Sequence, residues 1–79
     1  MTNTVLLEEI LADRGVTKKA MARKLGITPR TIYKIFQGKD ITVTQMQIFI
    51  EVLKMSKDEM AAVFFPNTVS YEATKLDEV

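Results

Sequence analysis

The residues of this sequence that could act together chemically are its cations. Between residues 14 and 39 the chain carries a net charge of +8, and the remaining residues hold all ten acids and a net −7. Such a concentrated cationic segment is typical of proteins that bind nucleic acid. A solvated basic surface on an ordinary domain is the alternative that charge alone leaves open. The eight cations are Arg14, Lys18, Lys19, Arg23, Lys24, Arg30, Lys34 and Lys39.

The residue types that usually carry catalysis or bind metals are missing. The 79 residues include no Cys and no His, which excludes disulfides, thiolate zinc sites, Cys nucleophiles and imidazole bases. Glu8 and Glu9, like Asp58 and Glu59, are adjacent acids, and adjacent helical residues point about 100° apart rather than at one site. We therefore expect no enzyme, no metal or other cofactor, and no small-molecule substrate.

The elements that must position the cations are predicted to be helices. Start and stop signals predict an all-α chain with helices at about residues 4–14, 18–25, 29–37, 43–54 and 57 to 64 or 65. Two of the start signals are capping boxes, Thr42 with Gln45 and Ser56 with Glu59. The length supports one small core. We expect one domain over residues 1–66 and a C-terminal tail over 67–79 that could be partly extended.

Helices two and three are predicted to form a helix-turn-helix motif. They are joined by only three residues, Gly26, Ile27 and Thr28. Gly26 supplies the left-handed residue that the turn needs, and Ala22 the small residue where the two helices cross. Apolar residues are available for the inner side, namely Met21, Leu25, Ile27, Ile32 and Ile35.

The third helix has one apolar and one polar face. At about 100° per residue, Ile32, Ile35 and Phe36 lie on one side of it. The opposite side carries no acid and consists of Arg30, Tyr33, Lys34 and Gln37. In the major groove, Arg or Lys can bond to guanine O6 and N7, and Gln can bond to adenine. We therefore expect Arg30, Lys34 and Gln37 to contact bases.

Residues 17–39 resemble the helix-turn-helix of the Cro and lambda-repressor-like (XRE-type) family. The resemblance extends over roughly residues 7–64, and the matching positions are Ala22, Leu25, Gly26, Ile27, Ile32, Ile35, Gly38, Lys39, Leu53 and Ser56. It implies a compact five-helix lambda-repressor-like DNA-binding domain. With no added C-terminal domain, the chain is similar to small regulators of phages and mobile elements.

The resemblance also implies individual DNA contacts. The family's base-reading positions correspond to Pro29, Arg30 and Lys34, and Pro29 could only touch a thymine methyl or set the entry of the helix. Its backbone-contacting positions correspond to Lys18 and Lys39. Beside them lie two further side chains that could bond phosphates, Thr28 and Tyr33.

The sequence departs from the family pattern at three places. Phe36 and Gln37 replace a Glu-Asn pair, and Leu11 occupies the position of an Arg that often pairs with that Glu. We expect Phe36 to be a core residue and a Leu11–Phe36 contact to replace the ion pair. Lys54 occupies the place of a Gly that usually ends the fourth helix, so the end of that helix is less sharply predicted.

The expected function is that of a sequence-specific regulator of transcription, in particular a repressor, bound to double-stranded DNA. A protein-interaction module on the same fold, such as an antitoxin or anti-regulator, is the alternative. The resemblance implies a homodimer on DNA, and the candidate self-association residues are Ile48, Val52, Phe65, Val69 and Tyr71. The sequence shows no signal peptide or membrane span, so we expect a cytoplasmic protein.

Overall fold

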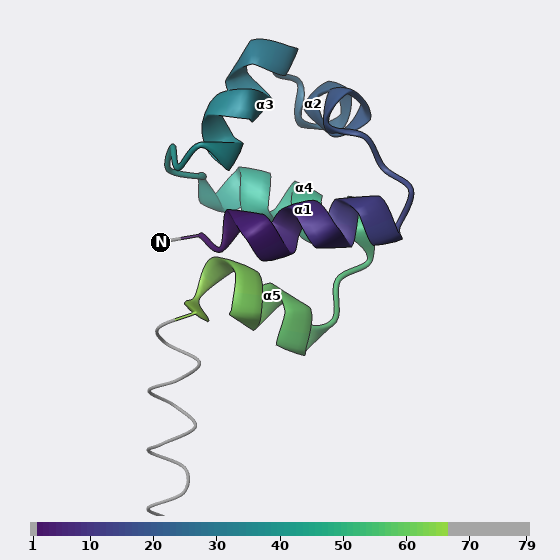
Figure 1. Cartoon of the computed structure of the whole chain (residues 1–79), viewed down its shortest axis with the longest axis vertical. Coiled ribbons are helices and arrows are strands. Elements are labelled where there is room, and N and C mark those ends of the chain that lie inside the picture. Colours follow the sequence, from purple (N-terminus) through teal and green to yellow (C-terminus); the bar gives the residue numbers. More distant parts are fainter. Residues whose placement is uncertain (1, 67–79) are drawn as a thin grey trace, which may run out of the picture.

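The computed structural model describes residues 2–66, which form five helices and no strand (Figure 1). Helices α2 and α3 lie together at one end of the molecule, and α5 lies on the opposite side of α1. α2 packs against α3 and α4, and α1 packs against α3 and α5. The all-α prediction is confirmed, whereas the expected tail lies outside the described residues. The helices are α1 (Thr4–Asp13), α2 (Lys18–Leu25), α3 (Pro29–Phe36), α4 (Val43–Leu53) and α5 (Lys57–Phe64).

Each helix begins at a residue whose side-chain oxygen accepts a backbone N–H three residues on. These caps are Asn3, Thr17, Thr28, Thr42 and Ser56. Both predicted capping boxes are present, because Gln45 accepts the Thr42 N–H at 3.1 Å and Glu59 accepts the Ser56 N–H at 3.0 Å. Such caps satisfy N–H groups that have no partner inside the helix, so they set where helices begin.

Two helices end in the left-handed conformation. Gly26 ends α2 with a φ of +73°, as the turn between α2 and α3 requires. Lys54 ends α4 in the same way with a φ of +52°, although it carries a side chain. The end of α4 therefore keeps the backbone that a glycine would favour, at a residue for which that conformation is strained.

The core lies where all five helices meet. Phe49 of α4 is fully buried there, and its ring centre lies 6.2 Å from that of Phe64 in α5. The residue before α1 also contacts this region, because the Asn3 N–H donates to the Val63 carbonyl at 2.7 Å. The buried cluster contains Leu7, Ile10, Leu11, Met21, Ala22, Ile32, Phe49, Leu53, Val63 and Phe64.

The described helices are all short. The longest is α4, with 11 residues, and within residues 2–66 no helix combines the length and the apolarity that crossing a bilayer requires.

Candidate nucleic-acid interface

The exposed side of α3 brings four predicted site residues together. Arg30, Tyr33, Lys34 and Gln37 line one shallow, open hollow on the surface of this helix. All four are exposed, and Tyr33 retains 55% of its accessible surface. The buried side of α3 carries Ile32 and Ile35, which are 0% and 1% exposed. The predicted division of α3 into a core side and a polar side is therefore confirmed.

Phe36 belongs to the inner side of α3, as expected. It is partly buried and packs against the core cluster, of which Leu11 is a buried member. A direct contact between Leu11 and Phe36 stays a prediction.

The start of α3 is fixed by Thr28 and Pro29. The Thr28 hydroxyl oxygen accepts the Thr31 N–H at 3.2 Å, and the two Thr hydroxyls lie 2.9 Å apart. Pro29 occupies the first position of the helix, where an N–H would have no intrahelical partner. The Thr28 hydroxyl is thus already engaged within the protein, while the exposed Pro29 ring sits at one end of the α3 face.

Lys18 lies beside this face but is not free. Its Nζ is 2.8 Å from Glu8 Oε1 and lies 5.4 Å from the ring centre of Tyr33 and 4.9 Å from that of Phe36. The ammonium therefore connects α1, α2 and α3. Glu8 was not predicted as its partner, because the pairing depends on how α1 packs beside the start of α2.

A second hollow extends the cationic surface onto α2. It is lined by Lys19, Ala22, Arg23, Ile27 and Pro29, so it lies where α2 and α3 meet. Lys19 and Arg23 are exposed there. Both belong to the basic segment of the sequence but were not predicted as site residues, since only the packing of α2 on α3 shows which cations of α2 border α3.

Arg14 has a structural partner away from α3. Its Nη2 lies 2.7 and 2.8 Å from the two carboxylate oxygens of Glu59, and its Nη1 lies 2.9 Å from Asp13 Oδ2. The hydrogen bond with Glu59 raises the pKa of Arg14, and the same bond lowers the pKa of Glu59. The Arg14–Glu59 ion pair links the end of α1 to the start of α5.

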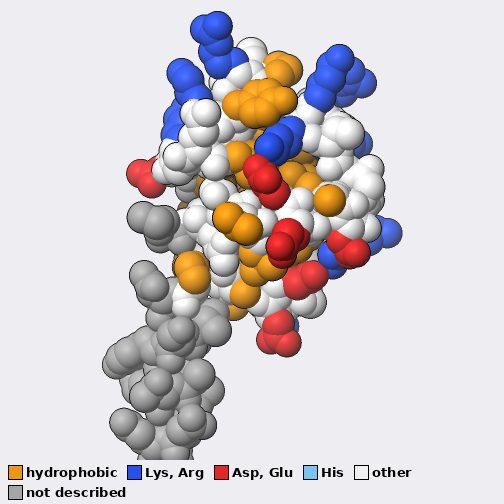
Figure 2. All heavy atoms as spheres, viewed as in Figure 1, with side chains coloured by type: hydrophobic (Ala, Val, Ile, Leu, Met, Phe, Trp, Pro, Cys, Tyr) orange, Lys and Arg blue, Asp and Glu red, His pale blue; other side chains and the backbone are white. Residues whose placement is uncertain are grey.

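The remaining cations of the basic segment are gathered around α2 and α3. Six of them form no ion pair within residues 2–66. Figure 2 shows Lys and Arg side chains concentrated at the end of the molecule formed by α2 and α3, with most acids of that face further down. The charge segregation seen in the sequence is thus also a segregation in space. The six are Lys19, Arg23, Lys24, Arg30, Lys34 and Lys39.

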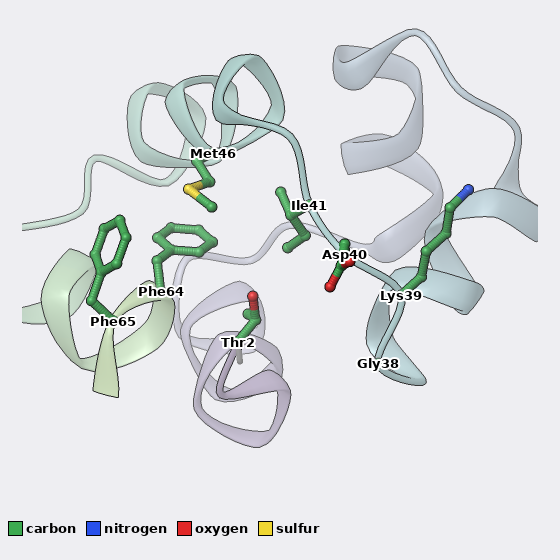
Figure 3. Close-up of a pocket in the computed structure, with 8 residues that line it drawn as sticks. All are labelled: Thr2, Gly38, Lys39, Asp40, Ile41, Met46, Phe64 and Phe65. Carbon is green, nitrogen blue, oxygen red and sulfur yellow. The ribbon is translucent and has the colours of Figure 1, made fainter. Parts of the chain in front are cut away.

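Lys39 is not brought into the hollow on α3. It follows the end of α3, is exposed, and lines a different groove together with Asp40 (Figure 3). In Figure 3 its side chain points away from the apolar part of that groove. Gln37, by contrast, caps the C-terminus of α3 and belongs to the hollow on α3.

The apolar part of this groove contains one candidate self-association residue, Phe65. It is 46% exposed, whereas Phe64 beside it is 4% exposed. Ile48 and Val52 are partly buried and pack against the core. Val69 and Tyr71 lie outside the described residues. The groove is lined by Thr2, Gly38, Lys39, Asp40, Ile41, Met46, Phe64 and Phe65 (Figure 3).

No group of three or more acidic, His or Cys side chains within residues 2–66 could hold a metal ion.

A family model described as Helix-turn-helix matches residues 7–60, well over half of the chain, and this stretch includes all of α2, α3 and α4. Neither the search of curated proteins nor that of solved structures gives a match.

Proposed function

The chain belongs to the helix-turn-helix family of the Cro and lambda-repressor-like type, whose members are DNA-binding regulators, and on this premise we propose that it is a sequence-specific repressor. In this proposal α3 enters the major groove of an operator. The observation that carries it is the hollow on α3, where Arg30, Tyr33, Lys34 and Gln37 lie together, exposed and without an acid.

The dimensions and chemistry of α3 suit base recognition. An α-helix with its side chains is about 10–12 Å in diameter, which fits the width of about 12 Å of the major groove. Arg30 and Lys34 are one helical turn apart, so both can reach guanine edges from one docking position. Gln37 at the far end can bond to adenine, and Pro29 at the near end can contact a thymine methyl.

The residues around α3 suit contacts with phosphates. Lys19 and Arg23 border α3 from α2, and Tyr33 lies on α3 itself. Lys18, Thr28 and Lys39 remain proposed phosphate contacts, although Lys18 must then exchange or share its Glu8 partner. Such contacts position the protein on the duplex and make its affinity depend on salt.

We further propose that two copies bind together through the groove that contains Phe65. A half-exposed Phe next to Met46 and Phe64 offers an apolar contact to a second subunit. Members of this motif class bind half-sites about one helical turn apart as dimers. Ile48, Val52, Val69 and Tyr71 remain further candidate self-association residues.

The experiment is selection from a library of randomised duplexes at a salt concentration of about 0.15 M. We expect a palindrome whose half-site centres lie about 10 base pairs apart. A single half-site would contradict the dimer while keeping base recognition. A lack of any enrichment would contradict the proposed function and favour the protein-interaction module.

Repression is tested separately, by placing the selected duplex across a promoter that drives a reporter gene. A repressor acts by occupying its site, so we expect expression of the reporter to fall when the protein is present. A rise in expression would identify an activator.

A further inference from the structure

We propose that Glu8 is a built-in competitor of the DNA backbone, which holds the Lys18 ammonium and thereby lowers the affinity of the protein for duplex DNA. The inference rests on the proposed function, and it adds an affinity-determining role for a residue of α1. Glu8 lies outside the motif formed by α2 and α3, and it carries a charge that DNA repels.

The geometry places this ion pair at the edge of the proposed DNA-binding face. Lys18 Nζ lies 2.8 Å from Glu8 Oε1 and 5.4 Å from the centre of the Tyr33 ring. Tyr33 in turn lines the hollow with Arg30 and Lys34. A phosphate bound beside Tyr33 would therefore lie within reach of the Lys18 ammonium and close to the Glu8 carboxylate.

The surroundings of Lys18 keep it in place while leaving its partner exchangeable. The rings of Tyr33 and Phe36 attract the ammonium, so its position does not depend on Glu8 alone. The Glu8 side chain is 49% exposed and that of Lys18 30% exposed. Ion pairs with this exposure are weak, and a phosphate of the duplex can displace the carboxylate.

Two consequences follow for DNA binding. Glu8 occupies one of the donors that Lys18 would offer to a phosphate, and its negative charge repels the same phosphate. Replacing Glu8 by Gln removes the negative charge, so the repulsion disappears and the remaining amide oxygen holds the ammonium more weakly. The released Lys18 should add about one neutralised phosphate to the complex, which steepens the salt dependence of log K by about 0.9.

The test compares Glu8→Gln with Glu9→Gln on a mixed-sequence duplex of about 20 base pairs, which suffices because phosphate contacts are independent of sequence. Glu9 is the matched control. It is the next residue of α1, it is exposed, its substitution makes the same change in net charge, and it forms no ion pair within residues 2–66.

We expect Glu8→Gln to bind the duplex roughly three- to fivefold more tightly than Glu9→Gln, because such a ratio corresponds to the free energy of one exposed ion pair. In a Lys18→Gln background the advantage of Glu8→Gln over Glu9→Gln should shrink, because only the direct repulsion between Glu8 and the phosphate is then removed. Thermal unfolding of each variant checks that the fold is retained.

Equal affinities of the two variants in the presence of Lys18 would overturn the proposal. So would a lower affinity of Glu8→Gln than of wild type, which would show that Glu8 only holds Lys18 in a productive position. If wild type itself failed to bind any duplex, the proposed function would fall with it. The wild-type measurement therefore separates the two failures.

Discussion

Lys54, at the end of α4, is the one described residue other than glycine with a positive φ, so its backbone should be strained. A left-handed residue with a side chain costs about 1–2 kcal/mol, and the extra freedom of glycine in the unfolded chain offsets about 0.4–1 kcal/mol of the gain. We expect Lys54→Gly to raise the free energy of unfolding by about 0.5–1 kcal/mol in urea titrations.

The control is Glu51→Gly, an exposed position in the right-handed part of the same helix. There the substitution should lower the free energy of unfolding by about 0.5–1 kcal/mol. Equal losses for Lys54→Gly and Glu51→Gly would show that Lys54 is not strained.

Glu59 predicts a pH dependence of stability. Hydrogen bonds from Arg14 and from the Ser56 N–H lower its pKa below the ordinary value of 4.5. At pH values above 4.5, the lowered pKa of Glu59 stabilises the folded state. This stabilisation is lost as the pH falls through the pKa that Glu59 has in the folded protein. We expect wild type to have a higher Tm than Glu59→Gln near neutral pH, with the difference shrinking as the pH falls below 4.5.

Gln is a suitable replacement because its side-chain oxygen can still complete the capping box with Ser56. In an Arg14→Gln background the difference near neutral pH should be smaller, since the larger of the two causes is gone. A Tm difference that is independent of pH would contradict the role given to the carboxylate.

At the scale of the elements, the start of α4 depends on Thr42. Its hydroxyl oxygen accepts the Gln45 N–H at 3.1 Å, and loss of such a cap costs about 1 kcal/mol. We expect Thr42→Ala to lower the free energy of unfolding by that amount. Thr44→Ala, an exposed change within the same first turn, should stay within about 0.5 kcal/mol. Comparable losses at both positions would argue against the cap.

The helices could be predicted closely because their signals are local. Thr28 followed by Pro29, and Gly26 before them, determine where α2 ends and α3 begins through bonds among neighbouring residues. The Asn3 cap was missed. The end of α4 was uncertain because Lys54 adopts a conformation that its residue type does not favour.

Some features of the candidate site depend on neighbouring residues in the sequence, and others depend on how distant helices pack. Helical spacing alone groups Arg30 with Lys34, since positions on one helix need no knowledge of packing. The pairs Arg14–Glu59 and Lys18–Glu8 join residues 45 and 10 positions apart, so they depend on how α1 packs against α5 and beside α2. Sequence spacing alone does not predict such pairs.

For the whole molecule, one shared core carries the stability. Phe49 is fully enclosed, and truncation of such a residue costs about 3–5 kcal/mol. Native domains are stable by roughly 0.05–0.15 kcal/mol per residue, so a loss of this size removes a large share of the stability of so short a chain. We expect Phe49→Ala to lose cooperative thermal unfolding in circular dichroism.

The matched control for the core is Val43→Ala, at a residue that is 68% exposed. It should change the free energy of unfolding by less than about 0.5 kcal/mol. A Phe49→Ala protein that melts as cooperatively as the Val43→Ala protein would show that stability lies elsewhere.

At the scale of the whole molecule, the charges of the described residues are segregated in space. The end formed by α2 and α3 carries six cations that form no ion pair within residues 2–66, and most acids of the face in Figure 2 lie away from it. Because this arrangement attracts a polyanion to one end and repels it elsewhere, it orients the protein before contact. We propose that α3 then reads bases.

The most direct measurement of that claim is the affinity of Arg30→Ala for the selected duplex and for duplexes with one base pair changed. If α3 reads bases, Arg30→Ala should bind the selected duplex about 1–3 kcal/mol more weakly than wild type, with no further penalty when the base pair read by Arg30 is changed. Lys54→Ala, a change of equal charge outside the proposed face, should retain the full preference. An equal loss of affinity on every duplex would contradict base reading by α3 and leave Arg30 as a phosphate contact.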